Sequence, residues 1–77
     1  MTLDIIISLL CKVIGVSEND LSGKTSLTPE YDIKPIDIAK LMIEIEKRFE
    51  VIIHDEDVHK FQTVNDIAKY VDTLIAE

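Results

Sequence analysis

The sequence has few of the residues that usually stabilise or functionalise small domains. It contains one cysteine, no tryptophan, and two residues each of glycine, proline, phenylalanine and tyrosine among 77 residues. A single cysteine, Cys11, excludes an internal disulfide. Basic residues are also scarce, since 8 Lys and Arg oppose 15 Asp and Glu for a net charge of −7. Nucleic acids and anionic lipids attract clusters of Lys and Arg, so neither is expected as the main partner, whereas a basic protein partner is compatible.

Long hydrophobic runs are absent as well. The longest apolar stretch, residues 5–10, is much shorter than the roughly 20 residues needed to cross a bilayer. The first four residues include Asp4 and lack the positive flank of a secretory signal. We therefore expect a cytoplasmic protein that contacts no membrane, with Cys11 as a reduced thiol in the core.

Branched aliphatic residues are abundant. The chain is 47% hydrophobic and includes 13 isoleucines, which excludes disorder. Its length leaves no room for a second domain, so residues 1–77 are predicted to form one. Such small domains bury only about 60% of the surface that the unfolded chain exposes, and stability must come from a dense apolar interior.

Helical spacing of apolar residues predicts the first helix. Leu3, Ile6, Leu10 and Val13 follow the three-and-four spacing of one helix face. Gly15 should end this helix, so we expect it over residues 2–15. The next 19 residues, from Val16 to Lys34, are rich in turn and capping residues. We expect a long loop fastened to the core by spaced apolar side chains, namely Leu21, Leu27, Tyr31 and Ile33.

The second half of the chain predicts three further helices. Pro35 suits the first turn of a helix, and the apolar spacing that follows extends this helix over residues 35–50. Residues 51–53 are predicted to be an extended connector in the core, and residues 55–61 a brief helix. Thr63 and Asp66 nearly match a capping box before a helix over 64–76. The expected class is all-α, a small four-helix bundle with three long helices, one short helix and a long first loop.

Motifs for catalysis or metal binding are missing. His54 and His59 flank three acidic residues, but their spacing fits neither HExxH nor an EF-hand loop. Both are interpreted as solvated surface residues, and no metal is expected. No nucleophile elbow or glycine-rich phosphate loop is present. We therefore predict a binding or carrier role for a chain that is not an enzyme and has no catalytic residues.

The order of elements resembles the acyl carrier protein family, small acidic four-helix proteins that carry acyl groups on a phosphopantetheine arm. The resemblance spans nearly the whole chain and is strongest over residues 46–57 and 61–66. Val13-Ile14-Gly15-Val16 is similar to the family's end of the first helix, and Ser26-Leu27 to its loop anchor. His54 stands where the family usually has Pro.

One departure concerns the attachment site. The family attaches its arm to the Ser of an Asp-Ser-Leu motif fourteen residues before the Phe that corresponds to Phe49. That position is Pro35, within Lys34-Pro35-Ile36-Asp37. A prolyl ring offers no hydroxyl, so we expect no phosphopantetheine and no cofactor. The nearest hydroxyls, Tyr31, Thr28 and Ser26, lie upstream of the motif.

A second departure concerns charge. The resemblance implies recognition through an acidic second helix, yet residues 34–50 contain four basic and four acidic residues. This helix is electrically neutral, and the acid lies in the flanking segments. Because charge complementarity sets partner choice, we expect a changed protein partner. The expected partner-binding residues are Lys34, Ile36, Asp37, Lys40, Glu44 and Lys47, with Ile36 as the apolar anchor if it is exposed.

The leading hypothesis is a monomeric acyl-carrier-like interaction module without an arm. The resemblance implies a setting in a specialised biosynthetic or peptide-maturation system, with biosynthetic or modifying enzymes as partners. The alternative is a working acyl or aminoacyl carrier modified at an unorthodox hydroxyl. A third hypothesis is a toxin-like or regulatory helical protein of convergent fold. Without a tethered chain to admit, the interior is predicted to be filled, with no deep apolar pocket beside Pro35.

Overall fold

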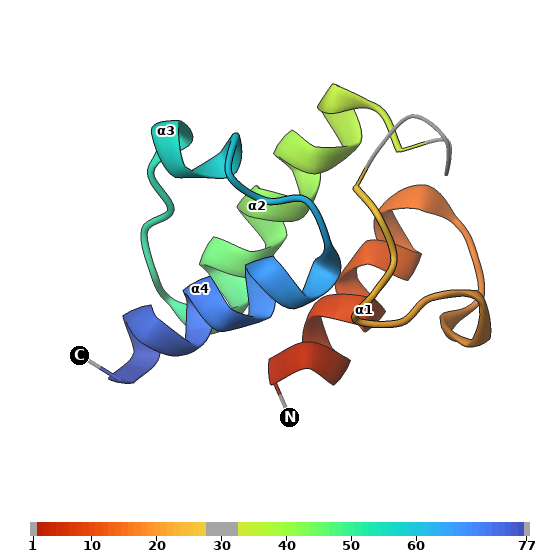
Figure 1. Cartoon of the computed structure of the whole chain (residues 1–77), viewed down its shortest axis with the longest axis horizontal. Coiled ribbons are helices and arrows are strands. Elements are labelled where there is room, and N and C mark those ends of the chain that lie inside the picture. The colour runs from red at the N-terminus through yellow and green to blue at the C-terminus, as the bar shows by residue number, and fades with distance from the viewer. Residues whose placement is uncertain (1, 28–32, 77) are drawn as a thin grey trace.

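The computed structural model describes residues 2–27 and 33–76, and helices form its framework (Figure 1). Three of them are long and one is a single turn, which confirms the predicted all-α class. In chain order the elements are α1 (Thr2–Ile14), the 3₁₀ turn η1 (Glu18–Asp20), α2 (Pro35–Phe49), α3 (Asp55–Val58) and α4 (Val64–Ala76). In Figure 1, η1 and α3 lie on opposite sides of the molecule. No helix among the described residues is long and apolar enough to span a bilayer.

Left-handed residues end the first two long helices. Gly15, at φ 74°, donates its N–H to the Cys11 carbonyl at 2.8 Å, which confirms the predicted end of α1. Glu50 adopts the same conformation, at φ 55°, after α2. Glycine reaches this region at little cost, whereas a residue with a Cβ does not.

The core joins the inner faces of the long helices. Helix α1 packs against both α2 and α4, and its most buried side chains are Ile6 and Leu10. The other buried apolar residues are Leu41, Met42 and Ile45 of α2, Val64, Ile67, Ala68 and Val71 of α4, and Ile33 and Ile53 of the connections. These residues form one contiguous cluster.

The α1–α2 connection is fastened as predicted where the structure describes it. Leu21 and Leu27 pack against the core and Ile33 is buried, whereas Tyr31 lies outside the described residues. Residues 21–27, here called the strap, also cap α4. The carbonyls of Gly23 and Thr25 accept the Asn65 and Val64 N–H groups at 2.8 and 3.1 Å. The strap thereby satisfies donors that the first turn of a helix leaves unpaired.

The start of α4 also confirms the predicted capping box. Asp66 Oδ2 accepts hydrogen bonds from the backbone N–H groups of Gln62 and Thr63 at 2.9 and 3.0 Å. The reciprocal bond, from the Asp66 N–H to Thr63 Oγ1, is long at 3.4 Å. The carboxylate therefore contributes more to this helix start than the hydroxyl does.

Two details of the predicted core are wrong. Residues 51–53 were expected to be pressed into the core, but only Ile53 is buried and Ile52 is 73% exposed. An extended segment turns alternate side chains to opposite faces, so one of the two isoleucines must point outward. Cys11 is half-buried and not fully inside. Desolvation, followed by the nearby Glu18 carboxylate, raises the pKa of its thiol, which opposes thiolate reactivity.

Helix α3 is tied to α4 through Asp57. The Tyr70 hydroxyl donates to Asp57 Oδ2 at 2.8 Å, and Lys60 Nζ lies 3.2 Å from Oδ1. The hydrogen bond from Tyr70, and then that from Lys60, lowers the pKa of the Asp57 carboxyl below its ordinary value of 3.8. The Tyr70 ring also meets Phe61 edge to face, with centroids 5.1 Å apart.

The helix ends give the first prediction. Gly15→Ala should lower the free energy of unfolding by about 1 kcal/mol, because alanine must adopt φ 74° there. Glu50→Gly should raise it, by less than about 1 kcal/mol, because relief of backbone strain exceeds the entropic cost of glycine. Urea unfolding followed by circular dichroism measures both changes. A loss of stability in Glu50→Gly would show that its left-handed backbone is not strained.

The Asp57 contact gives a pH-dependent prediction. A carboxyl whose pKa is lowered on folding stabilises the native state at pH values above the pKa that it has in the unfolded chain. This contribution is lost as the pH falls through the pKa of the folded state. Tyr70→Phe should therefore lower the urea midpoint at pH 7, and the difference from wild type should shrink below about pH 4. In an Asp57→Asn background the same substitution should have no pH-dependent effect. A constant difference across the pH range would instead assign the loss to packing.

Candidate functional site

The start of α2 carries the position of greatest interest. Pro35 is its first residue, and its side chain is exposed. The preceding Lys34 is extended and donates its N–H to Asp37 Oδ2 at 3.1 Å, while the Asp37 N–H donates to the Lys34 carbonyl at 2.9 Å. Asp37 thus caps the helix from its third position. The turn is complete without a serine, and Pro35 presents no hydroxyl for a phosphoester.

The face of α2 opposite the core alternates isoleucine with lysine. Ile36 and Ile43 are 60% and 51% exposed, and Lys40 and Lys47 are exposed too. A helix advances 100° per residue, so these four residues lie in one row. We call this row the outer ridge, made of Ile36, Lys40, Ile43 and Lys47. It combines apolar area with positive charge on a protein of net charge −7.

The structure brings together only part of the predicted partner surface. Ile36, Lys40 and Lys47 share the outer ridge, and Lys34 is exposed at the helix start. Asp37 and Glu44 are half-buried on a neighbouring side of the helix, where Glu44 Oε2 lies 3.9 Å from Lys12 Nζ. Sequence reasoning missed Ile43. Its spacing of seven from Ile36 is the signal that could have identified it.

A groove between α2 and the α3 segment contradicts the predicted filled interior. It has a volume of about 620 Å³ and opens beside Pro35. From α2 it is lined by Pro35, Ile38, Ala39, Met42, Ile43 and Glu46. From the facing segments it is lined by Leu27, Ile53, Asp55, Val58, His59 and Phe61. We call this cavity the α2–α3 groove.

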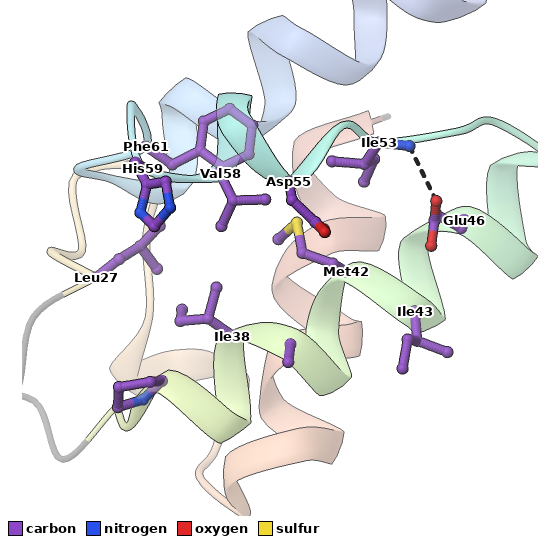
Figure 2. Close-up of a pocket in the computed structure, with 12 residues that line it drawn as sticks. Leu27, Ile38, Met42, Ile43, Glu46, Ile53, Asp55, Val58, His59 and Phe61 are labelled. Atoms are coloured by element: carbon purple, nitrogen blue, oxygen red, sulfur yellow. Dashed lines mark hydrogen bonds between the residues drawn. The ribbon is translucent and has the colours of Figure 1, made fainter.

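The groove exists because its outer wall is short. Helix α3 has one turn of four residues, whereas the residues of α2 that line the groove extend from Pro35 to Glu46. A single turn cannot cover that length, since a helix rises about 1.5 Å per residue. Figure 2 shows Val58 and Ile38 pointing toward each other from opposite sides of the groove.

Polar groups lie at two places along the groove. Glu46 Oε2 accepts the Ile53 N–H at 2.9 Å, which holds the connector after α2 against the helix (Figure 2). The carboxylate of Asp55 extends into the same part of the groove, toward Met42. His59 lies near Leu27, at a distance from Glu46 (Figure 2). One part of the groove is therefore acidic, and the imidazole lies in another.

The histidines lie where the sequence predicted. Both His54 and His59 are exposed. Of the neighbouring acids, Asp57 is already bonded to Tyr70 and Lys60. Within residues 2–27 and 33–76 no three His, Cys, Asp or Glu side chains come together as a metal site would require.

Comparison with protein families gives a match that covers most of the chain. The family model described as "Phosphopantetheine attachment site" matches residues 4–71. This range begins in α1 and ends within α4. It therefore includes the start of α2, the outer ridge and the α2–α3 groove. The match agrees with the predicted resemblance and removes the hypothesis of a merely convergent fold.

Proposed function

Because the chain belongs to the family of phosphopantetheine attachment domains, we propose that it is a carrier-like protein without an arm. Domains of this family act as carriers and not as catalysts. The proposed role is a non-catalytic interaction module that docks on a protein partner. No cofactor is attached in this proposal.

The observation that carries the proposal is the first turn of α2. Pro35 stands at the helical position where the resemblance implies the attachment serine, and Asp37 caps the turn through its carboxylate. Proline is well suited to this position, since its missing N–H would have no partner there. The sequence therefore keeps the helix start of a carrier, but at Pro35 it has no hydroxyl to which a transferase could attach phosphopantetheine.

The outer ridge is the proposed contact surface. Burying the side chains of Ile36 and Ile43 would contribute about 1.5–3 kcal/mol each if complete, and roughly half of each is exposed. Lys40 lies between the two isoleucines, and Lys47 lies one turn beyond Ile43. Their positive charges favour a partner that presents carboxylates around an apolar pocket. Lys34 extends this positive charge to the start of α2. Asp37 and Glu44 are proposed to border the surface.

The proposed setting follows from the resemblance. Carrier-related proteins of this kind accompany specialised biosynthetic or peptide-maturation systems, so the partner is proposed to be a biosynthetic or modifying enzyme. We propose that the chain works there as a cytoplasmic monomer.

The α2–α3 groove favours a second candidate, a working carrier modified elsewhere. Its volume and apolar lining would suit an acyl chain. Of the upstream hydroxyls, Ser26 is in the described part of the chain, where its backbone pairs with Thr63 in an isolated antiparallel bridge. Thr28 and Tyr31 lie outside that part. A modification at any of these residues would make this candidate the correct one.

A transferase experiment tests the missing attachment site. Wild-type protein incubated with a broad-specificity phosphopantetheinyl transferase and coenzyme A should keep its intact mass. The double variant Lys34→Asp/Pro35→Ser restores the acid and the hydroxyl, and it should gain the mass of one phosphopantetheine. The single variant Lys34→Asp controls for the added charge and should stay unmodified. A gain in the wild type, mapped to any Ser, Thr or Tyr, would refute the proposal.

A second experiment tests the outer ridge. The paired variant Ile36→Glu/Ile43→Glu should lose at least tenfold in the amount of partner captured from cells of the source organism, because it replaces the apolar contacts with charge. Ile52→Glu is the matched control, since Ile52 is 73% exposed but lies outside α2. Quantitative mass spectrometry identifies the proteins captured by wild type and by Ile52→Glu. If the paired variant captures the same proteins equally well, the partner binds elsewhere.

A further inference from the structure

The α2–α3 groove is accessible to an outside ligand when no arm is attached. It is an open cavity of about 620 Å³, within the usual range for small-molecule and side-chain sites. Nine of its twelve lining residues are apolar. The outer ridge touches it only at Ile43, so a ligand in the groove and a partner on the ridge meet largely different surfaces.

The charges around the groove select the ligand. Glu46 and Asp55 are its two carboxylates, and both lie in the same part of it (Figure 2). The Glu46 side chain is held by the Ile53 N–H through one oxygen at 2.9 Å, so its charge is fixed in place. The net charge of −7 adds a field that repels anions and attracts cations. A ligand with an apolar body and a positive group satisfies both features.

We propose that the α2–α3 groove binds, without a covalent bond, an apolar side chain of a basic peptide segment whose neighbouring Lys or Arg pairs with Asp55 and Glu46. The apolar side chain lies between Met42 of α2 and Val58 of α3. A free fatty acid has the same apolar body, but its carboxylate would meet this acidic part of the groove unfavourably. The inference rests on the proposed function in one respect, since a tethered acyl chain would compete for the same space.

Titration of peptides into isotope-labelled protein, followed by nuclear magnetic resonance, tests the inference. The probes are the acetylated hexapeptide Leu-Leu-Lys-Leu-Leu-Lys, its counterpart with Glu at both Lys positions, and dodecanoate. The lysine peptide should bind at least fivefold more tightly than either other probe. Its chemical-shift changes should centre on Ala39, Met42 and Val58. Equal binding of the two peptides, tighter binding of dodecanoate, changes centred elsewhere, or no binding would overturn the inference.

Two pairs of variants locate the site. Ala39→Phe places bulk in the groove from an exposed position and should weaken binding of the lysine peptide at least tenfold, whereas Ala76→Phe, at the exposed end of α4, should not. Asp55→Asn should raise the Kd about two- to fivefold, the effect of one exposed ion pair. Glu56→Gln removes the same charge from α3 outside the groove lining and should raise it less. Equal effects within either pair would contradict the assignment.

The protein used must first be shown by intact mass to carry no arm. If it carries one, the proposed function fails before the titration begins. If the unmodified protein does not bind the lysine peptide, only the present inference fails, and the proposed docking on the outer ridge is unaffected.

Discussion

The burial of Leu41 and Ile45 in the core fixes the rotation of α2 about its own axis, and the positions of the outer ridge and the α2–α3 groove depend on that rotation. Both side chains are completely buried, and α1 packs along α2. With this face turned inward, helical geometry turns Ile36, Lys40, Ile43 and Lys47 outward. Ile38 and Met42 then line the α2–α3 groove. A rotation of one residue would bury a lysine and expose core isoleucines, so the arrangement is strongly determined.

The helix starts show how α2 can begin without a serine at its first residue. In α2 and α4 alike, an aspartate in the first turn accepts backbone N–H groups: Asp37 from Lys34, and Asp66 from Gln62 and Thr63. These carboxylates satisfy donors that the helix itself cannot. A serine at the first residue of α2 is therefore unnecessary for folding, and a proline there preserves the shape.

Local signals in the sequence were sufficient for the three long helices, but the short helix ends at Val58 and does not continue to Phe61 as predicted. Gly15 marks the end of α1, and Thr63 with Asp66 marks the start of α4, because each acts through backbone contacts within a few residues. The same holds for Pro35 at the first residue of α2. The surface placement of both histidines followed from local polarity, whereas the exposure of Ile36 was left open by the sequence and is settled by the structure.

Features that depend on distances between segments could not be predicted from local sequence patterns. The α2–α3 groove arises because a four-residue helix faces a much longer one, and periodicity carries no information on the space between them. The capping of α4 by Gly23 and Thr25 joins residues about 40 positions apart, beyond the reach of local patterns. Ile52 and Cys11 were misplaced because an apolar run predicts burial without saying which side chains point outward.

The most direct test of the proposed loss of the attachment site is the intact mass of the protein isolated from its native cells, where its own transferases act. If Pro35 occupies the attachment position as proposed, the mass is that of the polypeptide alone, with no phosphopantetheine fragment released in tandem mass spectrometry. A population that carries the phosphopantetheine mass, assigned to any Ser, Thr or Tyr, would contradict it and establish a working carrier.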